Sequence, residues 1–273
     1  MVALAPDVTE ITYAIGAGGL LVAVNPAADY PAAARVLPRV RPEDVEAIVA
    51  ARPDLVLATA AGNDPRTVAR LRQLGLRTCT LDVTSFDRLA AACRLLGEVT
   101  GDRAAGERLG AAIAERARAL AGRAARLPRR RALYVVWPDP LIVAAPGTFH
   151  DDLLRRAGLD NLAPGGGGRY PRVDPELLLD PRLEVIVAPD ENEVRSGFAR
   201  LRRTPAGGRI AGGGVRVIWL PADAASRPGP RLVDALAALV AAREEEEAGP
   251  GVRDQGSGPL PADRQHRGQT EGR

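Results

Sequence analysis

An α/β unit that occurs twice is the feature that most constrains how this chain can fold. An apolar run closed by Ala-Pro at residues 1–6 recurs at residues 141–146. A short helical pattern that leads into an apolar strand at residues 45–58 recurs at residues 175–188. Each unit has the pattern strand, helix, loop, short helix, strand. A repeat of this length predicts two similar lobes, and the cleft between two lobes is a common place for a ligand.

Composition excludes several classes of protein. The sequence is 46% apolar and 26% charged, which is typical of a soluble globular protein. The net charge of +3 comes from arginine without any lysine, and only 3% of residues are aromatic, so we expect no nucleic-acid partner. No apolar run is long enough to cross a membrane, and the chain starts inside an expected strand without a signal peptide. Either the N-terminus has been trimmed or misassigned, or the protein stays in the cytoplasm.

We expect four segments along the chain. Residues 1–100 should form an N-terminal α/β lobe, and residues 129–243 should form a C-terminal one. Residues 101–128 between them carry a one-sided apolar stripe, which predicts a long helix that joins the lobes as a rigid strut. Residues 244–273 begin with four glutamates, which we expect to be a frayed helix end, and continue as a tail predicted to be disordered.

Helix and strand signals fill in each lobe. Asp7 with Glu10 three residues later resembles a capping box at the start of the first helix. The two cysteines, Cys79 and Cys93, are expected to be buried thiols, although a disulfide between them stays open. The patterns predict strands at 21–24, 55–58, 78–81 and 132–136 and helices at 42–51, 66–74, 85–97, 102–127 and 230–243.

Three aromatic residues directly precede proline: Tyr30, Trp137 and Tyr170. All three fall in predicted loops, where a residue before proline is extended and an aromatic ring can serve as a stacking platform. The alternative is that each ring packs on its own proline. Three such pairs spread over both lobes favour the cleft. Trp219 and Phe86 are expected in the core, and Phe198 fits either place.

A second set of candidates concerns acidic groups on a ligand. The Ala-Pro that ends each lobe's first strand leads into a helix whose exposed amides favour anions. Arg227 and Arg231 open the last helix and could bind the same groups in a bidentate manner, although the sequence slightly favours two solvated arginines.

Other polar clusters are not expected to form sites. His150 beside Asp151 and Asp152 suggests a metal, but helical neighbours point in different directions, and we expect a surface histidine. The glycines at 165–168 lack the residues of a phosphate-binding loop, so a flexible loop is the better interpretation. No catalytic constellation is visible, so we expect a binding protein rather than an enzyme.

An ordered set of short segments runs along both halves of the chain. They are residues 2–10, 14–18, 30–31, 37–40 and 45–57 in the first half, and residues 137–140, 146–149, 157–158, 170–173 and Glu176 in the second. With these segments the chain, from residue 1 to about 242, resembles the helical-backbone substrate-binding proteins of ABC importers. These are the receptors for cobalamin, ferric siderophores and haem, and the chain resembles the cobalamin branch most of all.

The resemblance implies two Rossmann-like α/β lobes bridged by one long helix, with little closure around a ligand in the cleft. The sequence departs from the family at Thr80 and Ala224, which stand at positions that are aromatic in cobalamin receptors. Of the two acidic knobs that dock on a permease, Asp64 lies near the first and Ser226 occupies the second. The ligand-binding residues that follow from motif and resemblance together are Tyr30, Trp137, Tyr170, Pro6, Asp7, Asp139, Thr148, Arg227 and Arg231.

The expected function is capture of a metal chelate for import, a corrinoid first and a ferric siderophore or haem next. We expect no intrinsic cofactor and no metal site, a monomer, and an ABC permease with its ATPase as partners. That role is extracytoplasmic, yet the chain shows no lipid-anchor cysteine. The alternative is a cytoplasmic accessory protein or enzyme that handles corrinoid or metal on the same scaffold. A receptor for free zinc or manganese is disfavoured by the shortage of histidines.

Overall fold

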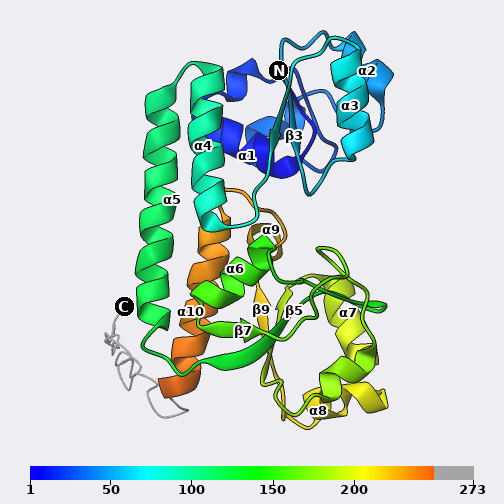
Figure 1. The fold of residues 1–273 in the computed structure, drawn as a ribbon, viewed down its shortest axis with the longest axis vertical. Coiled ribbons are helices and arrows are strands. Elements are labelled where there is room, and N and C mark those ends of the chain that lie inside the picture. The colour runs from blue at the N-terminus through cyan, green and yellow to red at the C-terminus, as the bar shows by residue number, and fades with distance from the viewer. Residues whose placement is uncertain (249–273) are drawn as a thin grey trace, which may run out of the picture.

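The computed structural model describes residues 1–248 and contains two β-sheets flanked by helices (Figure 1). The first sheet is parallel, with strand order β2-β1-β3-β4. Strands β1, β2 and β3 are nearly continuous buried apolar runs, as expected for a parallel sheet covered on both faces, whereas the edge strand β4 is partly exposed and carries two threonines. This lobe consists of β1 (Val2–Ala3), α1 (Pro6–Ala14), η1 (Gly18–Leu20), β2 (Ala23–Val24), η2 (Ala32–Val36), α2 (Val45–Ala50), β3 (Val56–Thr59), α3 (Pro65–Gln73) and β4 (Thr78–Leu81).

The second sheet repeats this arrangement with one addition. Strand β5 lies between β7 and β8, both parallel to it, while β6 extends the other end of β5 as an antiparallel hairpin. The elements are β5 (Arg130–Pro138), β6 (Leu141–Val143), α6 (Phe149–Arg156), β7 (Leu159–Asn161), η3 (Pro175–Leu179), β8 (Val185–Pro189), α7 (Asn192–Leu201), η4 (Pro205–Gly207), α8 (Gly208–Ala211), β9 (Arg216–Leu220) and α9 (Ala222–Ala225).

The predicted repeat is right in one half and wrong in the other. The segments at 45–58 and 175–188 both form a short helix followed by the strand that pairs with the first strand of its sheet. The repeated segment at 141–146 instead consists of β6 and the Ala-Pro that follows it, so this Ala-Pro does not close the first strand of the second lobe. The topological partner of β1 is β5, because each lies between two parallel neighbours. A hairpin strand has the same apolar pattern, so periodicity alone could not separate the two.

Two long helices, α4 (Phe86–Thr100) and α5 (Arg103–Ala124), lead from the first sheet to the second, and a third, α10 (Leu232–Ala248), ends the described chain and packs against α5. Figure 1 shows α4 and α5 side by side along one edge of the molecule, with α10 next to the lower part of α5. The predicted helix at 102–127 therefore forms. We propose that the two sheets and their helices act as two lobes joined by the α4–α5 hairpin.

Glycines allow α4 and α5 to approach very closely. A Cβ atom on Gly106 would lie 2.6 Å from the Cys93 carbonyl oxygen, and one on Gly110 would lie 2.7 Å from that of Ala90. A Cβ atom on Gly97 of α4 would lie 2.8 Å from the Gly106 Cα atom of α5. Such spacing brings backbone against backbone, so the helical hairpin has little freedom to slide or open.

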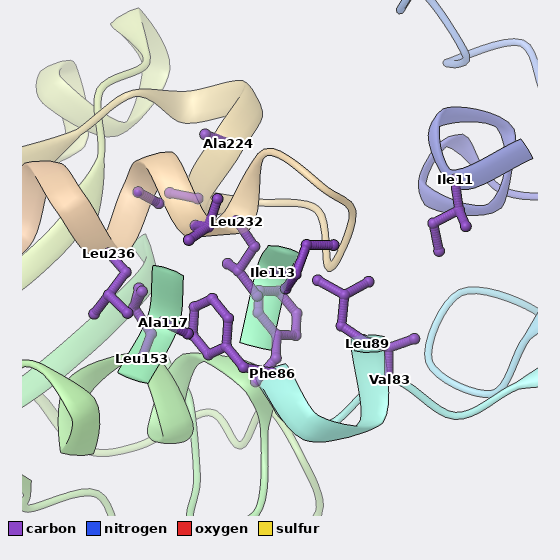
Figure 2. Close-up of a cluster of buried hydrophobic side chains, with 14 of the residues drawn as sticks. Ile11, Val83, Phe86, Leu89, Ile113, Ala117, Leu153, Ala224, Leu232 and Leu236 are labelled. Carbon is purple, nitrogen blue, oxygen red and sulfur yellow. The ribbon is translucent and has the colours of Figure 1, made fainter. Parts of the chain in front are cut away.

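One hydrophobic cluster runs through both lobes. Figure 2 shows Phe86 and Leu89 of α4 beside Ile113 of α5, with Leu153 of α6 and Leu232 of α10 packed against them. A hydrogen bond reinforces this junction: the buried Asp152 carboxylate of α6 accepts from the backbone N–H of Phe86, at 2.9 Å. The second lobe therefore caps the N-terminus of a first-lobe helix.

Two expectations about helix ends are wrong. Helix α1 starts with Ala5 as its N-cap and Pro6 at its first position, so Asp7 lies inside the helix and forms no capping box. The glutamates at 244–247 belong to α10 instead of a frayed tail, because arginines of neighbouring elements pair with them. Arg123 binds Glu244, and Arg130 binds Glu247 at 2.9 Å. The second lobe thus extends to residue 248, and the expected disorder of 249–273 lies outside the described residues.

The glycine contact between α4 and α5 gives a prediction about stability. We expect Gly106→Ala to lower the free energy of unfolding by about 1–3 kcal/mol, because the added methyl group forces the two backbones apart. Gly122→Ala, in the same helix, has open space around it and should raise stability by about 0.5–1 kcal/mol through helix propensity. Urea unfolding followed by circular dichroism measures both variants, and an equal gain from both would contradict the close contact.

Candidate functional site

A cleft of about 510 Å³ lies between the lobes and is lined by residues of both. The first lobe contributes the carboxyl ends of its strands and the start of α1, which is where parallel sheets usually bind ligands. The second lobe contributes mainly aromatic and apolar side chains. The lining residues are Leu4, Ala5, Pro6, Asp7, Asn25, Thr59, Ala61, Gly62, Tyr134, Val136, Trp137, Phe149, His150, Tyr170, Pro189, Glu191, Ser226, Arg227 and Pro228.

Five predicted ligand-binding residues come together in this cleft: Pro6, Asp7, Trp137, Tyr170 and Arg227. The other four lie elsewhere. Thr148 is the buried N-cap of α6, and its hydroxyl accepts from the N–H of Asp151 at 3.2 Å. Asp139 lies at the exposed end of the β5–β6 hairpin, where it lines a separate pocket.

Trp137 reaches the cleft because β5 is irregular at that point. The pairing between β5 and β6 shifts register between Val135 and Trp137, which marks a β-bulge. Neighbouring residues on a regular strand point to opposite faces, whereas a bulge re-aims side chains. Val136 and Trp137 consequently line the same cleft. The Trp137 indole N–H donates to the Asp139 carbonyl oxygen at 2.9 Å, which fixes the ring.

The floor of the cleft is aromatic. His150 lies against Tyr134 and Phe149, with ring centroids 4.0 and 3.8 Å apart, and Tyr170 meets it edge-on at 5.7 Å. The expectation of a surface histidine is wrong, because His150 is only 4% exposed. Its Nε2 contacts the Ala225 carbonyl oxygen at 3.1 Å. Burial lowers the pKa of His150 to about 3, so the ring is neutral.

The Arg227 and Arg231 side chains are each only 20% exposed, and both are paired with acidic side chains. Arg231 forms a bidentate pair with Glu10 of α1, with N–O distances of 2.6 and 3.0 Å. Arg227 donates to Asp29 of the first lobe at 2.6 Å. Both guanidinium groups also approach Asp223 of α9. These five residues, which we call the inter-lobe ion cluster, join the two lobes beside the cleft.

Tyr30 belongs to the edge of this cluster and does not line the cleft. Its side chain is 47% exposed, and the Arg231 guanidinium lies over its ring at 4.1 Å from the centroid. One face of the ring is therefore occupied by a cation–π contact. A further ion pair, between Arg169 and Asp82 at 3.0 Å, lies outside the cluster and also spans the lobes.

Asp7 is a carboxyl group of the cleft whose pKa is strongly raised. Its side chain is buried at the start of α1. Burial raises the pKa of Asp7 to about 7, against the opposing effect of nearby backbone N–H groups, and Glu10 raises it further. Near neutral pH this carboxyl group is present in both charge states, so it can donate or accept a hydrogen bond.

This geometry agrees with comparisons to known proteins. A family model described as periplasmic binding protein matches residues 1–206. The chain belongs to the periplasmic binding protein family. The vitamin B12-binding protein of Vibrio cholerae is 31% identical over 239 residues, which cover 86% of each chain. That of Vibrio vulnificus is 30% identical over 189 residues, covering 68% of this chain and 69% of the relative.

Solved structures show the same architecture. The periplasmic vitamin B12-binding protein of Vibrio cholerae superposes with a TM-score of 0.78 at 28% identity, covering 89% of this chain and 95% of that one. A periplasmic haem-binding protein from Roseiflexus sp. gives 0.73 at 26% identity, covering 89% and 98%. One from Pseudomonas aeruginosa gives 0.74 at 27%, covering 89% and 91%. This periplasmic binding protein is of the helical-backbone type, with α5 as the connector, and it is a binding protein rather than an enzyme.

Sequence reasoning missed part of the cleft. Tyr134, Phe149 and His150 form its floor, and Asn25 and Thr59 stand at strand ends of the first lobe. A signal for the last two exists, because polar residues directly after parallel strands often face the ligand. The aromatic floor gave no such signal, since buried rings in a strand or helix also fit a simple core.

The remaining expectations have mixed outcomes. Cys79 and Cys93 are free thiols, and burial raises the pKa of Cys93 to about 12. Phe86 and Phe198 are buried, whereas Trp219 is partly exposed and packs edge-on against Phe198. Within residues 1–248 no helix has the length and apolarity to cross a membrane, and no group of His, Cys, Asp or Glu side chains could hold a metal ion.

The buried Asp7 gives a prediction about pH. Because its pKa is raised on folding, ionisation of Asp7 costs stability as pH rises through about 7, and the cost is absent at pH values below the unfolded pKa of 3.8. Asp7→Asn should therefore stabilise the protein more at pH 8 than at pH 4, by a difference on the order of 4 kcal/mol. Urea unfolding at both values measures it, with the exposed Glu193→Gln as control. An equal effect of Asp7→Asn at both pH values would argue against a neutral buried carboxyl group.

Proposed function

We propose that this protein is the substrate-binding component of an ABC importer and that it captures a metal chelate, a corrinoid in the first place, in the cleft between its lobes. One observation supports this most strongly. Trp137 and Tyr170 of the second lobe line the same cleft as Pro6 and Asp7 at the start of α1. A broad, flat chelate needs opposed walls with few charges, and aromatic rings add affinity by stacking on it.

The relatives support the same ligand class. The curated relatives from Vibrio cholerae and Vibrio vulnificus bind vitamin B12, and the first of them aligns along most of both chains. Haem is the competing ligand, because the similar structures from Roseiflexus sp. and Pseudomonas aeruginosa are haem-binding proteins. A ferric siderophore is the third candidate. In each case the chelate is cargo rather than a resident cofactor.

The role implies a location and partners. We propose that the protein acts outside the cytoplasmic membrane as a monomer and delivers its ligand to a permease with an attached ATPase. Asp64, the exposed N-cap of α3, is the proposed docking residue of the first lobe. Ser226 occupies the matching place in the second lobe, at the end of α9, where it also borders the cleft. A cytoplasmic accessory protein or an enzyme has no support in the family or its relatives.

Calorimetric titration of the full-length chain tests the proposal. Cyanocobalamin, haemin and a ferric siderophore are titrated in parallel at the same salt concentration. We expect saturable one-to-one binding of cyanocobalamin with a negative heat-capacity change, the signature of buried apolar surface. Saturation by haemin or the siderophore alone would replace the corrinoid as ligand, and no binding of any of the three would contradict a chelate receptor.

Substitutions in the cleft should separate binding from folding. We expect Trp137→Ala and Tyr170→Ala each to weaken cyanocobalamin binding by about tenfold or more, because each removes a stacking surface worth about 1–2 kcal/mol. Tyr30→Ala should have a smaller effect, since that ring lies outside the cleft lining. Trp219→Phe, which keeps the packing against Phe198, serves as the control. Unchanged affinity in both Trp137→Ala and Tyr170→Ala would place the ligand elsewhere.

A further inference from the structure

The charged groups around the cleft are arranged in a way that bears on ligand choice. Among the residues that line it, Arg227 carries the only guanidinium group, and Asp7 and Glu191 carry carboxyl groups. His150 is neutral, as described above. The lining therefore has two acids against one base. A ligand that brings carboxylates into this cleft meets no surplus of positive charge.

Arg227 is also already engaged. It donates to Asp29 at 2.6 Å, and its guanidinium nitrogens lie 3.6 Å from a Glu10 oxygen and 3.8 Å from an Asp223 oxygen. The Arg227 side chain is only 20% exposed. The hydrogen bond from Arg227 in turn lowers the pKa of Asp29, so the pair stays charged.

The neighbouring arginine is held in the same way. Arg231 is bound by both oxygens of Glu10, and the Glu10 side chain is 2% exposed. A buried carboxylate in a bidentate pair is costly to separate, because each partner would be left as an unpaired charge. The inter-lobe ion cluster thus holds three carboxylates, those of Glu10, Asp29 and Asp223, against two guanidinium groups.

We infer that the inter-lobe ion cluster determines specificity, by withholding Arg227 and Arg231 from the ligand so that the cleft selects a chelate with a neutral, amide-bearing rim over one with a carboxylate rim. This inference rests on the proposed function and narrows its ligand class. Glu10 and Asp29 act through the arginines as positioning residues, because neither lines the cleft. Electrostatic mismatch of this kind discriminates between ligands more than it raises affinity.

A matched pair of ligands tests the inference. Cyanocobalamin carries neutral amides on its rim, and its monocarboxylic acid derivative differs by the hydrolysis of one of them, with the same metal and macrocycle. Both are titrated into the full-length protein at low and at physiological salt. We expect the wild type to bind the amide form about tenfold more tightly, with the difference shrinking as salt rises.

Two variants and a control locate the effect. Glu10→Gln releases Arg231, and Asp29→Asn releases Arg227; each should narrow the preference to about threefold or less by tightening binding of the acid form. Because Glu10 is buried, Asp29→Asn, at a half-exposed site, is the variant less apt to disturb folding, and thermal unfolding checks both. Glu193→Gln, an exposed acid on α7, should leave the ratio unchanged. A purely structural role of the cluster would weaken both ligands equally.

Other outcomes overturn the inference. Equal binding of the two corrinoids by the wild type, or a ratio unchanged in both folded variants, contradicts the role of the cluster while leaving the corrinoid receptor in place. Haemin bears two carboxylates on its rim, so tight binding of haemin by the wild type also contradicts the inference. If neither corrinoid binds, the corrinoid receptor proposed above is itself contradicted.

Discussion

The close contact between α4 and α5 is the constraint on which the arrangement of this molecule depends. Gly97, Gly106 and Gly110 bring the two backbones together without intervening side chains. Helix α4 follows the last strand of the first sheet, and α5 leads into the first strand of the second. Because α4 and α5 cannot slide past each other, they fix the end of the first sheet relative to the start of the second. The hydrophobic cluster through α6 and α10 extends this rigid contact into the second lobe.

This rigidity gives the cleft its shape before any ligand arrives. The lobes are joined by a shared core, by the Asp152 cap on α4, and by the inter-lobe ion cluster beside the cleft. A receptor built in this way loses little conformational entropy on binding, so stacking contacts contribute more fully to affinity. Its specificity must then come from the fixed chemistry of the walls, because induced closure cannot reject a poor ligand.

Much of the fold could be predicted from the sequence because its signals are local. Strand β4 has the bounds that its pattern predicted, and α5 follows its apolar stripe and its proline stop closely. The error at β6 arose because a hairpin strand and a central strand share one apolar pattern. The end of α10 was missed because its glutamates are stabilised by arginines more than a hundred residues away in sequence.

The cleft was harder to predict, because its chemistry depends on pairing across the lobes. Two of the three aromatic residues before proline, Trp137 and Tyr170, line the cleft, whereas the partner of Arg231 lies 221 residues away, and no local pattern reveals it. For the same reason the sequence predicted that His150, next to two aspartates, lies at the surface, although the fold encloses it among aromatic rings. Burial of polar groups is a property of the assembled lobes rather than of any segment.

A crystal structure of the full-length protein with cyanocobalamin would test the central claim most directly, namely that the ligand enters a preset cleft. We expect the corrin ring between the start of α1 and the side chains of Trp137 and Tyr170, with the Glu10–Arg231 pair intact and backbone shifts of about 1 Å or less. A corrin bound outside this cleft, or lobes rotated so that the pair is broken, would contradict it.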